Sequence, residues 1–161
     1  MRKHFTLALF TFIGTLTACG FHLAGRTPLP TALQNAQVQY TQKYEVLDVP
    51  LVAALREELV RRGANTLDKP NQTATQIEIL KITYSKRTVS VDSNGKALEY
   101  QLVTEAQYRA TRAEQPITDV LSQSVTRDYI YNAQAVLAAE AEEARLQQVM
   151  QQELANVMLL R

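Results

Sequence analysis

The chain has 161 residues, of which 46% are hydrophobic and 20% charged, a composition typical of a single globular domain. Its 17 Lys and Arg balance 16 Asp and Glu to a net charge of +1, which argues against a broad nucleic-acid-binding surface. One Cys excludes an internal disulfide and a cysteine-based zinc cluster, and two His argue against a histidine-centred metal site. We therefore expect no nucleic acid, no metal and no separate cofactor.

Residues 1–18 have the pattern of a secretory signal peptide. Arg2 and Lys3 precede an apolar stretch over residues 5–16, which is shorter than the roughly 20 apolar residues that a membrane-spanning helix needs. Leu-Thr-Ala then leads directly into Cys19. An aliphatic residue and two small residues before a cysteine match the lipobox of bacterial lipoproteins, in which the cysteine thiol takes a diacylglycerol.

We expect Cys19 to carry a covalent diacylglycerol and, after cleavage, an N-terminal acyl chain. One acyl chain binds a membrane with an association constant on the order of 10⁴ M⁻¹, so several chains make a firm anchor. Gly20 follows the cysteine, whereas Asp at this position commonly retains lipoproteins in the inner membrane of Gram-negative bacteria. These features predict a lipid anchor on the periplasmic side of the outer membrane. The alternative is an ordinary signal peptide with a chance cysteine behind it.

The mature chain is predicted to form one domain. Residues 19–35 are expected to be a lipidated, extended tether, because Gly25, Pro28 and Pro30 interrupt regular structure there. A single α+β domain is expected over residues 36–161. It begins with a short strand, in which Val38 and Tyr40 alternate with glutamines.

A helix is predicted next, with Pro50 in its first turn. Leu51, Leu55 and Leu59 repeat every four residues and supply its apolar face. Gly63 fits the position just beyond the C-terminus of this helix, where a positive φ is needed.

Two long strands joined by a tight turn follow. The first spans residues 75–91, and its apolar side switches between Ile79 and Leu80, which indicates a β-bulge. Asn94-Gly95 is a strong signal for a hairpin turn. The second strand alternates, and its expected buried side consists of Leu98, Tyr100, Leu102, Thr104, Ala106 and Tyr108.

Two more elements complete the domain. Apolar residues at every fourth position over 117–129 predict a further strand, although this spacing also fits a helix. Asn132 is expected to cap a final helix over residues 133–160, roughly 42 Å long. Its expected apolar stripe consists of Val136, Leu137, Leu146, Met150, Leu154, Val157 and Met158. The order β-α-β-β-β-α predicts an α+β fold, with two helices on one face of a four-stranded, mostly antiparallel sheet.

The sequence shows no pattern of an enzyme. It has no glycine-rich phosphate loop, no GxSxG and no HExxH, so we expect no catalytic residues. A hydrolase that uses a serine and a lysine is the enzymatic alternative. Cations gather instead along the long hairpin, at Lys81, Lys86, Arg87 and Lys96, where they could bind phosphate or protect a strand edge from aggregation.

Three segments resemble the lipopolysaccharide-assembly lipoprotein LptE (RlpB) family. They are CGFHL at residues 19–23, VDSNGKALEYQ at 91–101, and the stretch 127–137 with its Arg-Asp-Tyr start. The resemblance implies two helices packed on a four-stranded sheet. It also implies a complex with the outer-membrane β-barrel LptD, in which the lipoprotein plugs the barrel, aids its assembly and helps deliver lipopolysaccharide to the outer leaflet.

The resemblance also directs attention to the hairpin tip. Lipopolysaccharide binding in the family is attributed to one basic residue in the turn and one near the start of the final helix. Here Ser93 and the alanines 138 and 139 occupy these places. Either this member does not bind lipopolysaccharide directly, or the contact moves to other cations. The candidate ligand- and partner-binding residues are Lys86, Arg87, Ser93, Asn94, Gly95 and Lys96, and the three cations are expected to face water.

Two functions from different classes follow. The first is a non-enzymatic partner of the barrel in lipopolysaccharide export. The second is a periplasm-facing ligand-binding or chaperone lipoprotein without a barrel partner.

Overall fold

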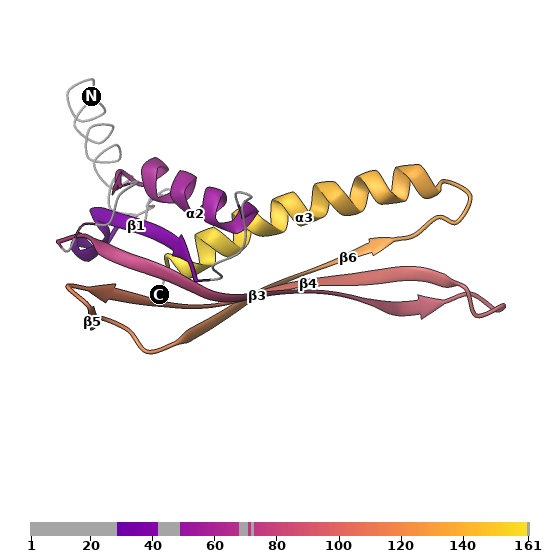
Figure 1. The fold of residues 1–161 in the computed structure, drawn as a ribbon. Helices are drawn as coiled ribbons and strands as arrows, with labels where there is room; N and C mark the ends of the chain where they lie inside the picture. Colours follow the sequence, from indigo (N-terminus) through magenta and orange to yellow (C-terminus); the bar gives the residue numbers. More distant parts are fainter. Residues whose placement is uncertain (1–28, 42–48, 68–70, 72, 161) are drawn as a thin grey trace, which may run out of the picture.

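The computed structural model describes residues 29–41, 49–67, 71 and 73–160. Two helices lie on one face of a β-sheet, so the predicted α+β fold is confirmed (Figure 1). In chain order the elements are the 3₁₀ helix η2 (Thr31–Leu33), β1 (Asn35–Tyr40), α2 (Pro50–Arg61), β2 (Asn65–Thr66), β3 (Thr75–Val91), β4 (Ala97–Arg112), β5 (Gln115–Pro116), β6 (Leu121–Ile130) and α3 (Val136–Met158).

The sheet is mixed and contains six strands rather than four. Its order is β2-β1-β3-β4, and both β5 and β6 pair with β4. The four longer strands are those that the sequence predicts, and β2 and β5 add two residues each. β1 runs parallel to β2 and β3, whereas β3, β4, β5 and β6 pair antiparallel. β1 can run parallel to β3 because the connection between them, which contains α2, returns the chain to the end of the sheet at which β1 begins.

The predicted β-bulge in β3 is confirmed. The register passes from Ile79 opposite Tyr108 to Lys81 opposite Gln107, so Leu80 is the extra residue. An extra residue reverses which side chains face the helices. Beyond the bulge it is the even-numbered residues of β3 that turn toward α3.

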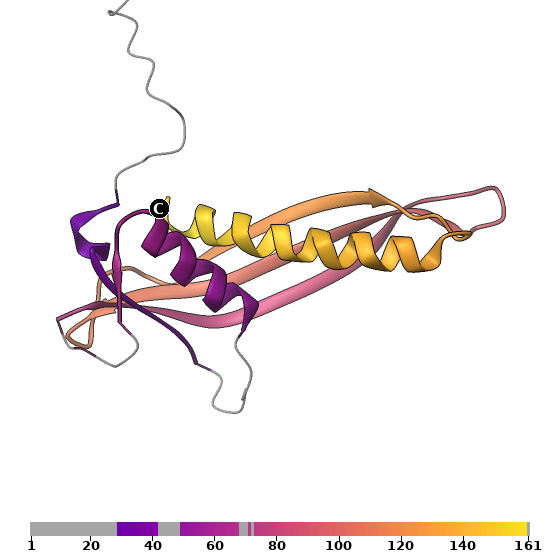
Figure 2. The same ribbon diagram turned by 90° about the horizontal axis from the view of Figure 1, so that it is seen from above.

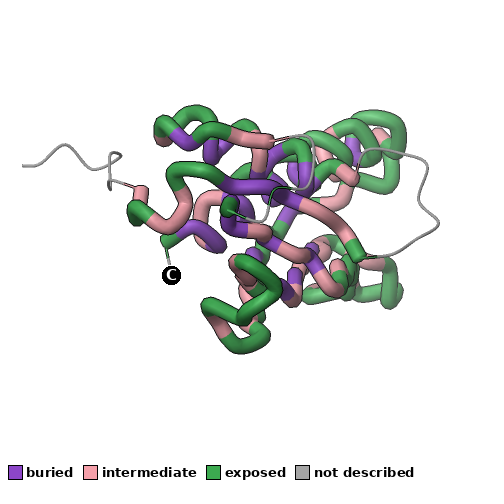
Figure 3. Tube along the Cα trace, turned by 60° about the vertical axis from the view of Figure 1, so that its left-hand side comes forward, coloured by how far each residue is buried: buried purple, intermediate pink, exposed green. Residues whose placement is uncertain are grey.

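The core lies between the sheet and two helical segments, α2 and the C-terminal half of α3. Figure 3 shows the buried residues gathered on the facing sides of these layers. Leu51, Leu55 and Leu59 on α2 and Met150 and Leu154 on α3 have no exposed surface. The chain leaves α2 through Gly63, whose φ of 89° confirms the predicted left-handed end of this helix.

The described end of the expected tether differs from an extended linker. η2 forms there, and Leu29 and Leu33 pack against the core. Arg112 fixes this segment to the sheet, since its Nη2 donates to the carbonyl of Ala32 at 2.5 Å and to Oγ1 of Thr75 at 2.8 Å. Pro30 therefore directly precedes folded structure rather than interrupting a linker.

The final helix begins later than the sequence predicts. It starts at Val136, because Asn132 makes a separate turn: its Oδ1 accepts from the N–H of Gln134 at 2.9 Å and its carbonyl from that of Ala135 at 3.0 Å. Val136 and Leu137 are 42% and 82% exposed, so the expected start of the apolar stripe is wrong. These residues lie beyond the end of the core.

Two regions differ in how they are built. We call α2, β1, β2 and the parts of β3, β4 and α3 beside them the proximal body. The distal arm is the rest of the β3–β4 hairpin, with β6 and the N-terminal half of α3. Figures 1 and 2 show this arm projecting away from α2, with the hairpin tip extending past the start of α3.

Candidate functional site

The hairpin turn is organised by Asp92. Its Oδ1 accepts from the N–H groups of Asn94 at 2.8 Å and Lys96 at 2.9 Å, and its carbonyl accepts from the N–H of Gly95 at 3.0 Å. Gly95 has a φ of 77°, as the sequence predicts. The side chains of Ser93, Asn94 and Lys96 are therefore exposed at the tip of the distal arm.

The structure separates Lys86 from Arg87. Neighbouring residues of a strand point to opposite faces of the sheet, and Lys86 turns toward α3, where its Nζ lies 2.5 Å from Oε2 of Glu143. Arg87 lies on the open face opposite Gln101 of β4 and forms no ion pair with a described residue. The cations that the sequence groups together thus do not form one patch.

Lys86 belongs to a polar and aromatic network, which we call the Lys86 network. Oε2 of Glu143 also accepts from the hydroxyl of Tyr129 at 2.6 Å. The Lys86 ammonium lies 4.2 Å from the ring centre of Tyr100, and Tyr131 packs edge-on against that ring at 5.3 Å. Although 39% of the Lys86 side chain is exposed, its charge is taken up by these partners. Lys86 is thus exposed, as expected, but it is ion-paired rather than free.

The pKa shifts describe a fixed ion pair. Burial lowers the pKa of Lys86, but its hydrogen bonds with Glu143 and Tyr129 outweigh burial and leave the pKa raised. The pKa of Glu143 is lowered, mainly by the hydrogen bond from Lys86 and then by that from Tyr129. Burial and the bond to Glu143 raise the pKa of Tyr129. At neutral pH the network holds one cation, one carboxylate and a protonated phenol, an arrangement that fastens α3 to the β3–β4 hairpin and β6.

The free positive charge lies on the open face of the sheet and at the tip. Lys81, Arg87 and Lys96 are exposed, and none of them forms an ion pair within the described part of the chain. Arg109, on the same face, is paired with Glu78 at 2.6 Å. Arg87 and Lys96 are the two of these cations on the tip side of β3 and β4, so an anionic ligand at the tip would meet them first, whereas Lys81 lies at the bulge.

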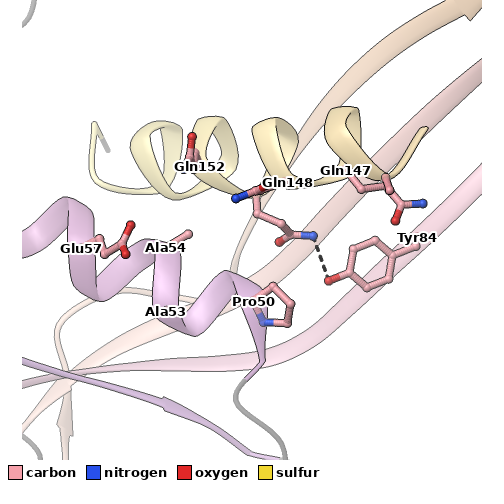
Figure 4. Close-up of a pocket in the computed structure, with 10 residues that line it drawn as sticks. Pro50, Ala53, Ala54, Glu57, Tyr84, Gln147, Gln148 and Gln152 are labelled. Atoms are coloured by element: carbon pink, nitrogen blue, oxygen red, sulfur yellow. Dashed lines mark hydrogen bonds between the residues drawn. The ribbon is translucent and has the colours of Figure 1, made fainter. Parts of the chain in front are cut away.

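A groove of about 650 Å³ runs between α2 and α3 (Figure 4). Its floor includes Tyr84 of β3, whose hydroxyl accepts from Nε2 of Gln151 at 3.0 Å. Its one charged residue is Glu57, and its walls are otherwise alanine, proline and glutamine. A groove without a cation does not suit a phosphate group.

The described residues hold no cluster of three or more His, Cys, Asp or Glu that could bind a metal ion. No helix in this part of the chain combines the length and apolar character needed to cross a bilayer. Cys19, the expected lipid attachment site, lies outside the described residues.

Sequence reasoning missed Glu143 and the role of the tyrosines. The alternation in β4 correctly predicted that Tyr100 faces the helices. The even spacing of apolar residues over 117–129 placed Tyr129 on the apolar side of its strand. Glu143, however, is 57 residues from Lys86, and nothing in the local pattern marks it among the glutamates of its helix. Its partnership depends on how α3 packs.

Solved structures share this α+β fold of two helices on one face of a sheet. A minor lipoprotein from Acinetobacter baumannii superposes with a TM-score of 0.64 at 17% identity, over 81% of this chain and 90% of that one. An uncharacterized lipoprotein B from Nitrosomonas europaea gives a TM-score of 0.67 at 22% identity, over 87% of this chain and 88% of that one.

Sequence comparison identifies the family. The family model LptE, described as lipopolysaccharide-assembly, matches residues 32–161. The LPS-assembly lipoprotein LptE of Pectobacterium atrosepticum is 31% identical over 153 residues, which cover 94% of this chain and 80% of that protein. The protein of the same name from Photorhabdus laumondii is 27% identical, with the same coverage of the two chains. The chain belongs to the LptE family.

Proposed function

We propose that this protein is an outer-membrane lipoprotein that forms a complex with the β-barrel LptD, aids assembly of the barrel and helps deliver lipopolysaccharide to the outer leaflet. Membership in the LptE family, over residues 32–161, carries this proposal. The role is a non-enzymatic one. The observed fold supports it, because the distal arm presents a long polar sheet surface to a partner.

Affinity capture of the intact protein from detergent-solubilised outer membranes tests the complex. We expect LptD to be recovered in a fixed ratio to the lipoprotein. Recovery of the lipoprotein alone, under conditions in which the barrel is detected in the membrane extract, would favour a periplasm-facing ligand-binding or chaperone lipoprotein instead.

The anchor is proposed at Cys19, in the outer membrane and facing the periplasm. Cys19→Ala removes the thiol that takes the diacylglycerol, so labelling of the protein with a fatty-acid probe is expected to disappear. The folded domain is expected to keep its melting temperature, because the described core begins ten residues further along, at Leu29. Equal labelling of the alanine variant and the wild type would contradict an anchor at this residue.

Direct contact with lipopolysaccharide is proposed for Arg87 and Lys96, with Ser93-Asn94-Gly95 shaping the tip between them. Both cations are exposed and unpaired within the described residues, and guanidinium and ammonium groups bind phosphate through charge-assisted hydrogen bonds. Lys86 has a positioning role, since it fastens the β3–β4 hairpin to α3.

The double variant Arg87→Glu/Lys96→Glu tests this contact. We expect it to lose binding to purified lipopolysaccharide while keeping its fold, and wild-type binding to weaken as salt rises. Lys81→Glu/Arg145→Glu makes the same change of net charge away from the tip and is the control. Equal loss in both variants would point to net charge rather than to the tip.

A further inference from the structure

β6 has one edge without a strand partner. It pairs with β4 in unbroken register, from Leu121 opposite Tyr108 to Ile130 opposite Glu99. No described strand pairs with its other edge, which forms a border of the sheet in Figure 2. The backbone along this border is a ready template for one more strand.

The outward backbone groups of β6 can be assigned. The N–H of Tyr131 donates to the carbonyl of Leu98 at 2.8 Å, just beyond the end of the strand. Pairs in an antiparallel ladder alternate between bonded and non-bonded, so the odd-numbered residues of β6 bond to β4. The even-numbered residues direct both backbone groups outward. They are Ser122, Ser124, Thr126, Asp128 and Ile130.

These outward groups are almost all unpaired within the described part of the chain. The carbonyl of Thr126 accepts from Nη1 of Arg127 at 3.1 Å, and this is the one such bond that the described residues make. Arg127 itself is exposed and its other nitrogen contacts Glu153 of α3. Backbone donors and acceptors in this number are satisfied either by water or by an added strand.

The opposite free edge is built differently. Beyond Ile79, β3 also has no described strand beside it, but three register shifts interrupt it and Lys81 and Arg87 stand along it without an ion pair. Bulges and cations are features that discourage strand addition. β6 has no register shift, no proline and no lysine, and the side chains of Arg127 and Asp128 contact Glu153 and Gln101. The β6 edge lacks the protection that the β3 edge carries.

The chemistry of the β6 edge suits a polypeptide. Arg127 is ion-paired with Glu153 and Asp128 keeps its negative charge, so the edge does not attract an anionic lipid head group. Its outward residues Ser122, Ser124 and Thr126 are small, and exposed apolar side chains flank it: Val120 is 56% and Ile130 is 82% exposed. An edge without a free cation and with apolar residues at both ends fits an extended chain that pairs through its backbone.

We infer that the free edge of β6 binds an extended segment of the barrel partner by strand addition. This inference rests on the proposed function, which supplies a partner built from β-strands. The residues that bind are the outward backbone groups at 122, 124, 126 and 128, and their side chains lie on the open face of the sheet.

A proline at an outward position tests the pairing. Ser124→Pro removes a backbone N–H that the ladder with β4 does not use, and proline is tolerated in edge strands at such positions. Capture from solubilised outer membranes is expected to recover at least tenfold less LptD than wild type. Thr88→Pro is the control on the β3 edge, where the N–H also points outward, and it is expected to retain LptD. Val125→Pro interrupts the ladder itself and marks the effect of unfolding.

Hydrogen–deuterium exchange of the wild-type complex gives a readout that does not depend on a proline variant folding. Amides at 122, 124, 126 and 128 are expected to exchange more slowly in the complex than in the free lipoprotein, whereas β3 beyond Lys81 stays unchanged. Capture of LptD at equal levels by wild type and a folded Ser124→Pro, or unchanged exchange in β6, would overturn the inference and leave the proposed function standing. Failure of wild type to capture LptD would overturn both. A dimer of the purified chain that Ser124→Pro abolishes would assign the edge to a second copy instead.

Discussion

The proximal body and the distal arm are stabilised in different ways. In the proximal body, leucines and a methionine without exposed surface fill the space between two helices and the sheet. In the distal arm, one helix covers the hairpin, and the Lys86 network joins them through a lysine, a glutamate and three tyrosines. The difference indicates that the proximal body supplies most of the stability, whereas the arm leaves strand edges and free cations available to partners.

The largest loss of stability is expected from Leu55→Ala in the proximal body. Leu55 has no exposed surface, so truncation leaves a cavity and costs about 2–5 kcal/mol of unfolding free energy. Val60→Ala on the same helix is the control, because Val60 is 56% exposed and its truncation is expected to change stability by no more than about 0.5 kcal/mol. Urea unfolding measures both, and similar losses would mean that this core is not where stability resides.

A smaller loss is expected from Glu143→Ala in the distal arm. This change removes the acceptor of both Lys86 and Tyr129 and is expected to cost about 1–2 kcal/mol, since hydrogen bonds to charged groups contribute at this level. Glu142→Ala is the matched control, because Glu142 forms an exposed pair with Arg145 that contributes little. Equal midpoints of urea unfolding for the two variants would exclude a stabilising role for the network.

Gly95→Ala at the tip is expected to cost about 1 kcal/mol, because an L-residue is disfavoured in the left-handed conformation. A Cβ there meets no atom within 4 Å, so the cost is one of backbone conformation alone. Gly95→Asn is expected to restore part of the loss, since asparagine tolerates this conformation. A worse result with asparagine, measured by thermal unfolding, would point to a steric conflict instead.

The smallest effect is the dependence of the arm on pH. Because the pKa of Glu143 lies below its ordinary value of 4.5 in the folded state, its contribution is fully present above pH 4.5 and is lost as pH falls through the lowered value. The difference in stability between wild type and Glu143→Gln is therefore expected to shrink from pH 7 to pH 3. Urea unfolding of both proteins at the two pH values measures this. A difference between their midpoints that is larger at pH 3 than at pH 7 would contradict the expected direction.

Local features were predictable because neighbouring residues cause them. The switch of the apolar side at Leu80 identified the bulge, the Asn-Gly pair identified the turn, and the repeat of leucines identified α2. Each depends on backbone conformation or alternation over a few residues. The family, too, could be recognised from short segments around Cys19, the hairpin turn and the start of the final helix.

Tertiary packing decided the rest. Lys86 and Arg87 are adjacent in sequence, yet the pleat of β3 places them on opposite faces, and only α3 brings Glu143 within reach of the first. The parallel pairing of β1 and the late start of α3 likewise depend on where distant segments meet. The alternation of residues along a strand determines which face of the sheet each side chain occupies. The partner of that side chain depends on which element covers the face, and this is settled when the helices dock onto the sheet.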